Sequence, residues 1–175
     1  MAETIRFYLG FGSNLGNREG FLKEAWRLLA VHPDLDMRRL SRMVETDPVG
    51  AIGRPAPGGR YLNAVGEGET RLGPQELLRW CQRVESCLGR VRRGPDSPRT
   101  IDIDLLFYGT TVLHRPFPAW ATPLTVPHSR VLERGFVLEP LAELAPDLVH
   151  PVTQKTVAQH WLEWAAAQGR PEARE

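Results

Sequence analysis

The most informative stretch of this chain is Arg90-Val-Arg-Arg-Gly-Pro-Asp-Ser-Pro-Arg99-Thr-Ile-Asp102-Ile-Asp104-Leu-Leu-Phe107. In its second half apolar side chains alternate with polar ones, which predicts a β-strand with one buried face and one open face. Successive side chains on a strand point to opposite faces, so Asp102 and Asp104 project from the same face. Their backbones are then about 7 Å apart.

A carboxylate pair held this close needs a shared proton or a nearby cation, because the two charges repel each other. The arginines that precede the strand could supply positive charge, and arginine also grips phosphate through a planar fork of donors. Paired carboxylates beside an arginine cluster therefore favour magnesium and a polyphosphate, hence a nucleotide. A surface strand with solvated acids, next to a loop of solvated bases, is the alternative that this stretch alone leaves open.

Size and composition indicate one globular domain. The chain has 175 residues, of which 42% are hydrophobic and 25% charged, with a net charge of +1. That length allows a substantial core, and a balanced charge gives no basic field for nucleic acid. Cys81 and Cys87 form no CxxC pair, so we expect reduced thiols in the cytoplasm rather than a zinc site. No segment predicts a signal peptide or a membrane span.

Hydrophobic periodicity predicts helices over residues 18–31, 74–88 and 157–167, and a shorter one over 136–144. Strands are expected over residues 4–11, 37–46 and 61–70, and residues 110–113 are expected to return as a hairpin after the aspartate strand. The glycine- and proline-rich residues 49–59 are a loop, either a functional lid or a variable surface loop. Interspersed strands and helices predict an α/β or α+β sandwich, with helices over a mixed, mostly antiparallel sheet.

Three further groups of residues could bind a ligand. The glycines of residues 10–16 follow a strand and precede a helix, but the spacing matches neither common phosphate-loop pattern, so close approach of a flat ligand is the better reading. Tyr61 and Asn63 share a strand face, where an aromatic ring and an amide suit a planar heterocycle. Thr125, His128 and Arg134 lie within a dozen residues, although a lone histidine is more often structural.

Together these motifs resemble one family, the 6-hydroxymethyl-7,8-dihydropterin pyrophosphokinases of folate biosynthesis. The resemblance covers about residues 5–155, and its most specific run is the signature Pro98-Arg-Thr-Ile-Asp-Ile-Asp-Leu-Leu-Phe107. The other matching blocks follow in the family's order: Tyr8-Leu-Gly-Phe-Gly-Ser-Asn-Leu-Gly16, Tyr61-Leu-Asn-Ala-Val65, Gln82-Arg-Val-Glu85, Gly89-Arg-Val-Arg92, Leu124-Thr-Val-Pro-His128 and Arg134-Gly-Phe-Val-Leu-Glu-Pro-Leu141.

The resemblance implies a single catalytic domain over residues 1–175, with a C-terminal helix and tail from 156. It implies a three-layer sandwich with a ferredoxin-like core, and a cytoplasmic monomer that binds neither nucleic acid nor membrane. The implied reaction moves the pyrophosphoryl group of ATP to the hydroxymethyl oxygen of 6-hydroxymethyl-7,8-dihydropterin and releases AMP. Two Mg²⁺ ions would bridge the triphosphate.

The resemblance also assigns site residues. The implied metal ligands are Asp102 and Asp104, and these act in catalysis with Arg90 and Arg92. The implied ATP-binding residues are Leu78, Gln82, Glu85, Arg90, Arg92, Arg99, Leu105, Thr125, His128 and Arg134. The implied pterin-binding residues are Gly12, Thr46, Asp47, Val49, Tyr61, Asn63 and Phe136.

The chain departs from the family pattern at a few positions. The loop before Pro98 has Asp96 and Ser97 where the family often has a tryptophan, and Ser129 stands where a tyrosine is often found. Two other functions are weighed: a non-catalytic ferredoxin-like binding module, and a nucleotidyltransferase, which also uses paired aspartates on a strand. The products made from ATP separate all three, since a nucleotidyltransferase releases pyrophosphate and a binding module releases nothing.

Overall fold

A computed structural model describes residues 3–48, 59–91, 98–115 and 123–169 of the chain. Its strands, in chain order, are β1 (Ile5–Ser13), β2 (Leu35–Leu40), β3 (Val44–Thr46), β4 (Tyr61–Thr70), β5 (Asp102–Tyr108), β6 (Leu113–Arg115) and β7 (Leu124–Val126). Its helices are α1 (Arg18–Leu29), α2 (Pro74–Cys87), α3 (Gly135–Leu144) and α4 (Val157–Ala167).

The main sheet has the strand order β2-β4-β1-β5, with β3 added beside β4. Each pairing between these strands is antiparallel. Helix α1 connects β1 to β2, and α2 connects β4 to β5, so the sheet is made of two interleaved βαβ units, as in a ferredoxin-like core. The expectation of a mostly antiparallel sheet is confirmed.

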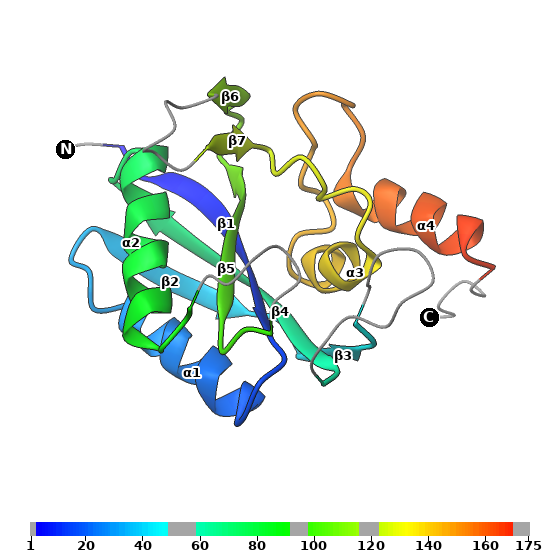
Figure 1. Cartoon of the computed structure of the whole chain (residues 1–175). Coiled ribbons are helices and arrows are strands. Elements are labelled where there is room, and N and C mark those ends of the chain that lie inside the picture. Colours follow the sequence, from blue (N-terminus) through cyan, green and yellow to red (C-terminus); the bar gives the residue numbers. More distant parts are fainter. Residues whose placement is uncertain (1–2, 49–58, 92–97, 116–122, 170–175) are drawn as a thin grey trace.

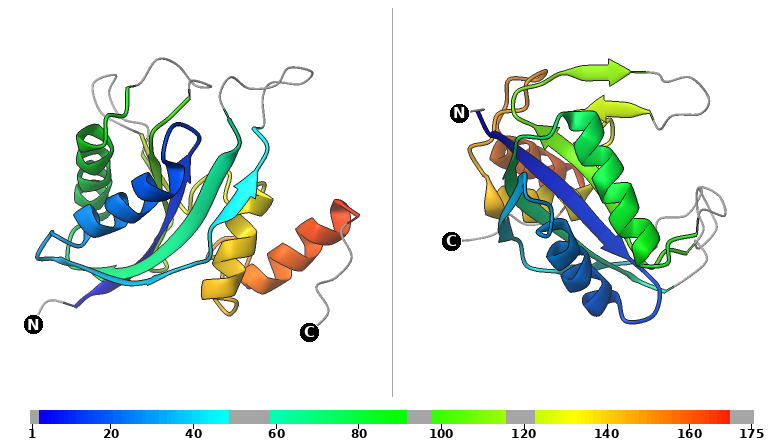
Figure 2. Two further views of the ribbon diagram at one scale, coloured as in Figure 1. Left: turned by 90° about the horizontal axis from the view of Figure 1, so that it is seen from below. Right: turned by 90° about the vertical axis from the view of Figure 1, so that its left-hand side faces the viewer.

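Helices cover both faces of this sheet, which gives three layers (Figures 1 and 2). Helices α1 and α2 lie over one face, where Phe7, Leu9 and Phe11 of β1 are buried in a large core. Helix α3 lies over the other face, with α4 packed beside it, and this second core contains Tyr8 and Leu106. The alternation of β1 therefore supplies both cores.

Residues 37–46, expected as one strand, form two strands, because the chain leaves regular pairing at Ser41. The amide of Ser41 donates to the carbonyl of Val65 (2.9 Å), whereas the amide of Val65 donates to the Ser41 hydroxyl (2.9 Å) instead of to a backbone carbonyl. A side chain thus replaces one acceptor of the ladder. The expected return hairpin at residues 110–113 is also wrong, since β6 pairs with β7 and not with β5.

The expected helices are confirmed within a few residues. Asn17 caps α1 by accepting from the amide of Gly20 (3.0 Å), and Pro74 occupies the first turn of α2. Both cysteines are free thiols: Cys81 is buried in the core, and Cys87 is exposed. No helix among the described residues is long and apolar enough to cross a membrane.

Candidate active site

The candidate site lies on the face of the main sheet that carries α3, and its floor is the part of that face beside the helix. In the register of the sheet, Asp104 pairs with Gly10 and Asp102 pairs with Gly12. Gly12 in turn pairs with Asn63 of β4. Residues paired across antiparallel strands point to the same face. Two carboxylates and an amide therefore flank a strip of β1 that carries no side chains.

A cavity of about 380 Å³ lies over this floor. This volume is within the range of small-molecule sites in proteins. It reaches from the edge of β3 and β4, across β1 and β5, to the start of α3. The lining side chains from the sheet include Thr46, Asp47, Tyr61, Asn63, Asp102 and Asp104, and those from α3 and the residues before it include Arg130, Glu133, Arg134 and Phe136.

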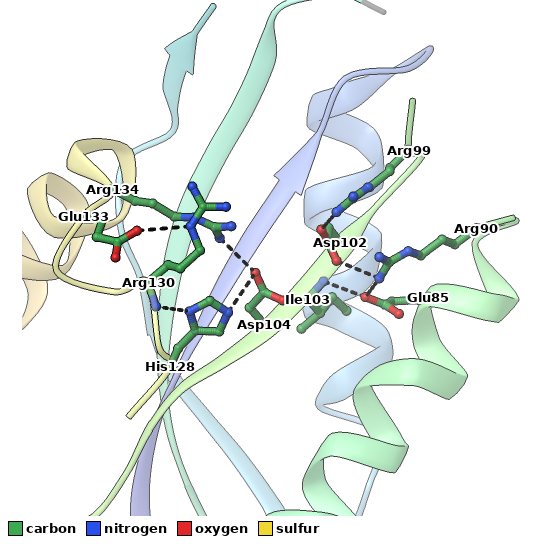
Figure 3. A network of polar contacts seen from close by, with 10 residues as sticks. All are labelled: Glu85, Arg90, Arg99, Asp102, Ile103, Asp104, His128, Arg130, Glu133 and Arg134. Atoms are coloured by element: carbon green, nitrogen blue, oxygen red, sulfur yellow. Dashed lines mark hydrogen bonds and ion pairs between the residues drawn. The ribbon is translucent and has the colours of Figure 1, made fainter. Parts of the chain in front are cut away.

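Asp102 lies between two arginines, as Figure 3 shows. Nη1 of Arg90 is 2.6 Å from Oδ1 of Asp102, and Arg99 contacts the other carboxylate oxygen. Arg90 also pairs with Glu85 of α2, which is buried and accepts a hydrogen bond from the amide of Ile103 (2.7 Å). Glu85 thus joins α2, β5 and an arginine in one network.

Asp104 has weaker partners than Asp102. Its Oδ2 is 3.5 Å from Nη1 of Arg134 and 4.0 Å from Nε2 of His128. Burial, reinforced by the negative charge of Asp102, raises the pKa of Asp104 above its ordinary value, and the charges of His128 and Arg134 only partly offset this rise. The carboxylate of Asp104 is therefore held at a net electrostatic cost, which a bound cation would relieve.

His128 is oriented by the turn that follows it. The amide of Arg130 donates to Nδ1 of His128 (3.1 Å), so the neutral ring carries its hydrogen on Nε2, the atom that faces Asp104. Burial lowers the pKa of His128, with Asp104 acting in the opposite direction. The side chain of Arg130 itself pairs with Glu133 (3.2 Å) in the wall of the cavity.

The wall of the cavity formed by β3 and β4 is polar, and hydrogen bonds and an ion pair fix its side chains. Nδ2 of Asn63 donates to Oγ1 of Thr46 (2.9 Å), which fixes the amide that shares the floor with Gly12. Asp47 pairs with Arg60 (2.9 Å) at the edge of the cavity. Tyr61 and Asn63 both line the cavity, so the expectation that they share one face is confirmed.

Several of the described residues that the resemblance assigns to ATP do not line this cavity. Leu78 of α2 and Leu105 of β5 are buried in the core between the sheet and helices α1 and α2, and Glu85 bonds to the β5 backbone on that side of the sheet. Gln82 lines a separate apolar groove between α1 and α2. Thr125 lies in the β6–β7 hairpin, where its hydroxyl is 3.0 Å from Nδ1 of His114. The assigned residues Val49 and Arg92 lie outside the described residues.

Sequence reasoning missed other residues of the cavity. Arg130 and Glu133 line the cavity, and they could have been predicted because they follow His128 closely in the chain. Trp164 of α4 also lines the cavity, although it lies thirty residues beyond Arg134 in the sequence. No local pattern points to Trp164, because only the packing of α4 against α3 brings it there.

The donor set suits a hard divalent cation. Carboxylate oxygens are the protein ligands that Mg²⁺ prefers, usually one or two of them with water and substrate phosphates completing the shell. Asp102 and Asp104 supply such a pair on one face, and a cation there would offset the burial and the repulsion by Asp102 that raise the pKa of Asp104. No group of three or more metal-ligating side chains occurs in the part of the chain that the structure describes. A carboxylate pair leaves most of the Mg²⁺ shell to water and substrate phosphates.

Comparison with known proteins gives one consistent result. Residues 8–146 match the 7,8-dihydro-6-hydroxymethylpterin-pyrophosphokinase family. The chain is 37% identical over 152 residues to a 2-amino-4-hydroxy-6-hydroxymethyldihydropteridine pyrophosphokinase of Bacillus subtilis, covering 87% of this chain and 85% of the relative. It is 38% identical over 154 residues to a folic acid synthesis protein of Pneumocystis carinii, covering 88% of this chain but only 19% of that protein.

Solved structures agree on the fold. A Plasmodium falciparum HPPK-DHPS structure with pterin and p-hydroxybenzoate superimposes with a TM-score of 0.77 at 14% sequence identity, over 97% of this chain and 44% of that one. The chain thus spans about a fifth of the fungal relatives and under half of the Plasmodium protein. Since the family match covers most of its length, the chain belongs to the 7,8-dihydro-6-hydroxymethylpterin-pyrophosphokinase family.

Proposed function

We propose that this chain transfers the pyrophosphoryl group of ATP to the hydroxymethyl oxygen of 6-hydroxymethyl-7,8-dihydropterin, giving the pterin diphosphate and AMP. The observation that carries the proposal is the cavity, in which two strand-borne carboxylates, three arginines and an aromatic and amide wall converge. Family membership and the names of the bacterial relatives support the same activity.

Asp102 and Asp104 would hold Mg²⁺ together with the triphosphate, and two ions are the number we propose. When bound there, magnesium would supply positive charge that offsets the charge of the phosphates. The chain's own part is to keep both carboxylates on one face. Glu85 does this from below, because its bond to the Ile103 amide fixes the backbone between them.

The arginines would bind the phosphates. Arg90 and Arg99 now pair with Asp102, and Arg134 with Asp104. When a cation takes over the carboxylates, these guanidinium groups can turn to phosphate oxygens, for which their planar fork is suited. We propose the same task for Arg92. Such positioning and charge stabilisation supply most of the rate in phosphoryl transfer, and we assign no general base.

The pterin would lie on the glycine floor. Asn63 and Thr46 offer an amide and a hydroxyl to the edge of the heterocycle, and Tyr61 and Phe136 offer aromatic surface. Without a side chain at Gly12 a flat ring could approach the sheet closely. We propose that Asp47 and Val49 also contact the pterin.

We propose that residues 1–175 act as one catalytic domain and as a monomer. One chain supplies every wall of the described cavity, which supports this. Free thiols at Cys81 and Cys87 fit a reducing compartment such as the cytoplasm.

The decisive experiment incubates the chain with ATP, Mg²⁺ and 6-hydroxymethyl-7,8-dihydropterin, followed by separation of the nucleotides and pterins. The expected products are AMP and the pterin diphosphate in equal amounts, and omission of magnesium should stop the reaction. Release of pyrophosphate with a nucleotidylated pterin would indicate a nucleotidyltransferase. Absence of turnover with retained binding would indicate a binding module.

A further inference from the structure

Trp164 of α4 reaches into the cavity although its helix lies outside the 8–146 family match. It is half-buried, and its indole contacts two residues at the start of α3, one just before the helix and one at its first position. Nε1 donates a hydrogen bond to the carbonyl of Glu133 (3.2 Å). The ring lies against Gly135 so closely that a Cβ atom there would be 2.5 Å from Cζ2 and Cζ3 and nearer still to Cη2.

These two contacts flank Arg134, the residue between Glu133 and Gly135. Arg134 is the N-cap of α3 and reaches Asp104, and its guanidinium lies 5.7 Å from the ring of Phe136. Trp164 therefore holds the start of α3 on both sides of a residue that reaches the aspartate pair. Position 135 has room only for glycine, because the indole of Trp164 occupies the space that a side chain would need.

The indole is also cavity surface, in the same wall as Phe136. An aromatic face is the kind of surface that a bicyclic heterocycle contacts most favourably. Trp161 stacks on the indole (centroids 5.6 Å apart, planes at 14°), but among the described residues it does not line the cavity.

We propose that Trp164 is a substrate-site residue of this enzyme: it forms part of the pterin-binding wall and positions the Arg134–Phe136 segment. This proposal rests on the proposed function. A tryptophan that merely packs α4 on α3 would contribute to stability alone. The two roles separate in the kinetic constants for the pterin and for ATP.

The experiment compares Trp164→Leu with Trp161→Leu, which removes an equal indole from the same helix but none from the cavity. Wild-type product formation is established first, and kcat, the KM of each substrate and Tm are then measured for each variant. We expect Trp164→Leu to raise the KM for the pterin by about 3–10-fold, the equivalent of one aromatic contact, and to change the KM for ATP less. Trp161→Leu should leave both KM values near wild type.

Gly135→Ala provides an independent check, because the three heavy atoms nearest to its methyl group would all belong to the Trp164 indole. Alone it should lower kcat/KM for the pterin. In the Gly135→Ala/Trp164→Leu double variant the methyl group has room, so kcat/KM should return to that of Trp164→Leu. Trp164→Phe keeps a ring without the bond to Glu133 and should raise the KM less, and it replaces Trp164→Leu if that variant does not fold.

An active wild type in which both Trp164 variants keep a normal pterin KM and lose only Tm would overturn the inference and leave the proposed function standing. Additive losses in the double variant, or an equal effect of Trp161→Leu, would also overturn it. A wild-type chain that makes no pterin diphosphate would refute both proposals, and this would be seen before any variant is compared.

Discussion

Neutralising either aspartate should abolish activity, but the two substitutions should shift stability in opposite directions. Asp104→Asn keeps the shape of the side chain and removes a charge whose pKa is raised by burial and by Asp102. A carboxyl with a raised pKa in the folded state binds its proton more tightly there than in the unfolded chain. Its charge therefore opposes folding once the pH has risen above the unfolded value, and Asp104→Asn removes that opposition.

The magnitude follows from the strand geometry. Two charges about 7 Å apart at an effective dielectric constant of about 20 repel by roughly 2 kcal/mol. The substitution also removes the partly exposed ion pair between Asp104 and Arg134 (3.5 Å), and this loss offsets about half of the relieved repulsion. Asp104→Asn should thus gain about 1 kcal/mol, or about 2–4 °C in Tm.

Asp102→Asn should lose stability, since Arg90 and Arg99 are partly buried and both pair with this carboxylate. We expect a loss of roughly 1–3 kcal/mol. The assay is thermal unfolding without ligands at neutral pH, together with AMP formation under saturating substrates. Both variants should lose at least ~100-fold in kcat, because each removes a metal ligand.

An active Asp104→Asn enzyme would refute the metal assignment. A stability loss equal to that of Asp102→Asn would refute the electrostatic reasoning, because the Asp104 charge would then be stabilising. As a further control, Mg²⁺ with ATP should raise the Tm of the wild type, whereas Asp104→Asn should show little of this shift.

Other substitutions test other parts of the structure. Glu85→Ala should cost about 3 kcal/mol in urea unfolding, because the buried amide of Ile103 and the guanidinium of Arg90 lose their acceptor, whereas Glu85→Gln, which keeps an acceptor, should cost less. Arg92→Ala should lower kcat far more than it raises the pterin KM, as for a contact made in the transition state, and equal losses would contradict that role. Burial lowers the pKa of His150 below the ordinary histidine value of about 6.5. The unfolded chain therefore binds more protons in acid than the folded chain does, and the folded state loses stability as the pH drops below about 6.5. Unfolding free energies between about pH 5 and pH 7 should then be less pH-dependent in His150→Gln, and an unchanged slope would exclude this effect.

Local patterns predicted most elements because each is decided by nearby residues. Apolar residues recur with helical periodicity over residues 157–167, which form α4. Asp102 and Asp104 share a face because residues two apart on a strand point to the same side. The split at Ser41 escaped prediction, since it depends on a hydroxyl that bonds to the amide of Val65 on another strand.

The family, the aspartate strand and the paired carboxylates could all be predicted before the fold was known, because a two-residue period and a specific motif are local properties of the chain. Which charges face those carboxylates depends on the packing of distant elements. Asp102 pairs with two arginines, whereas the partners of Asp104 lie at 3.5 and 4.0 Å. Likewise, Trp164 enters the site only because α4 packs against α3. Such contacts join residues far apart in the chain, and their energies depend on distances and burial that no local pattern contains.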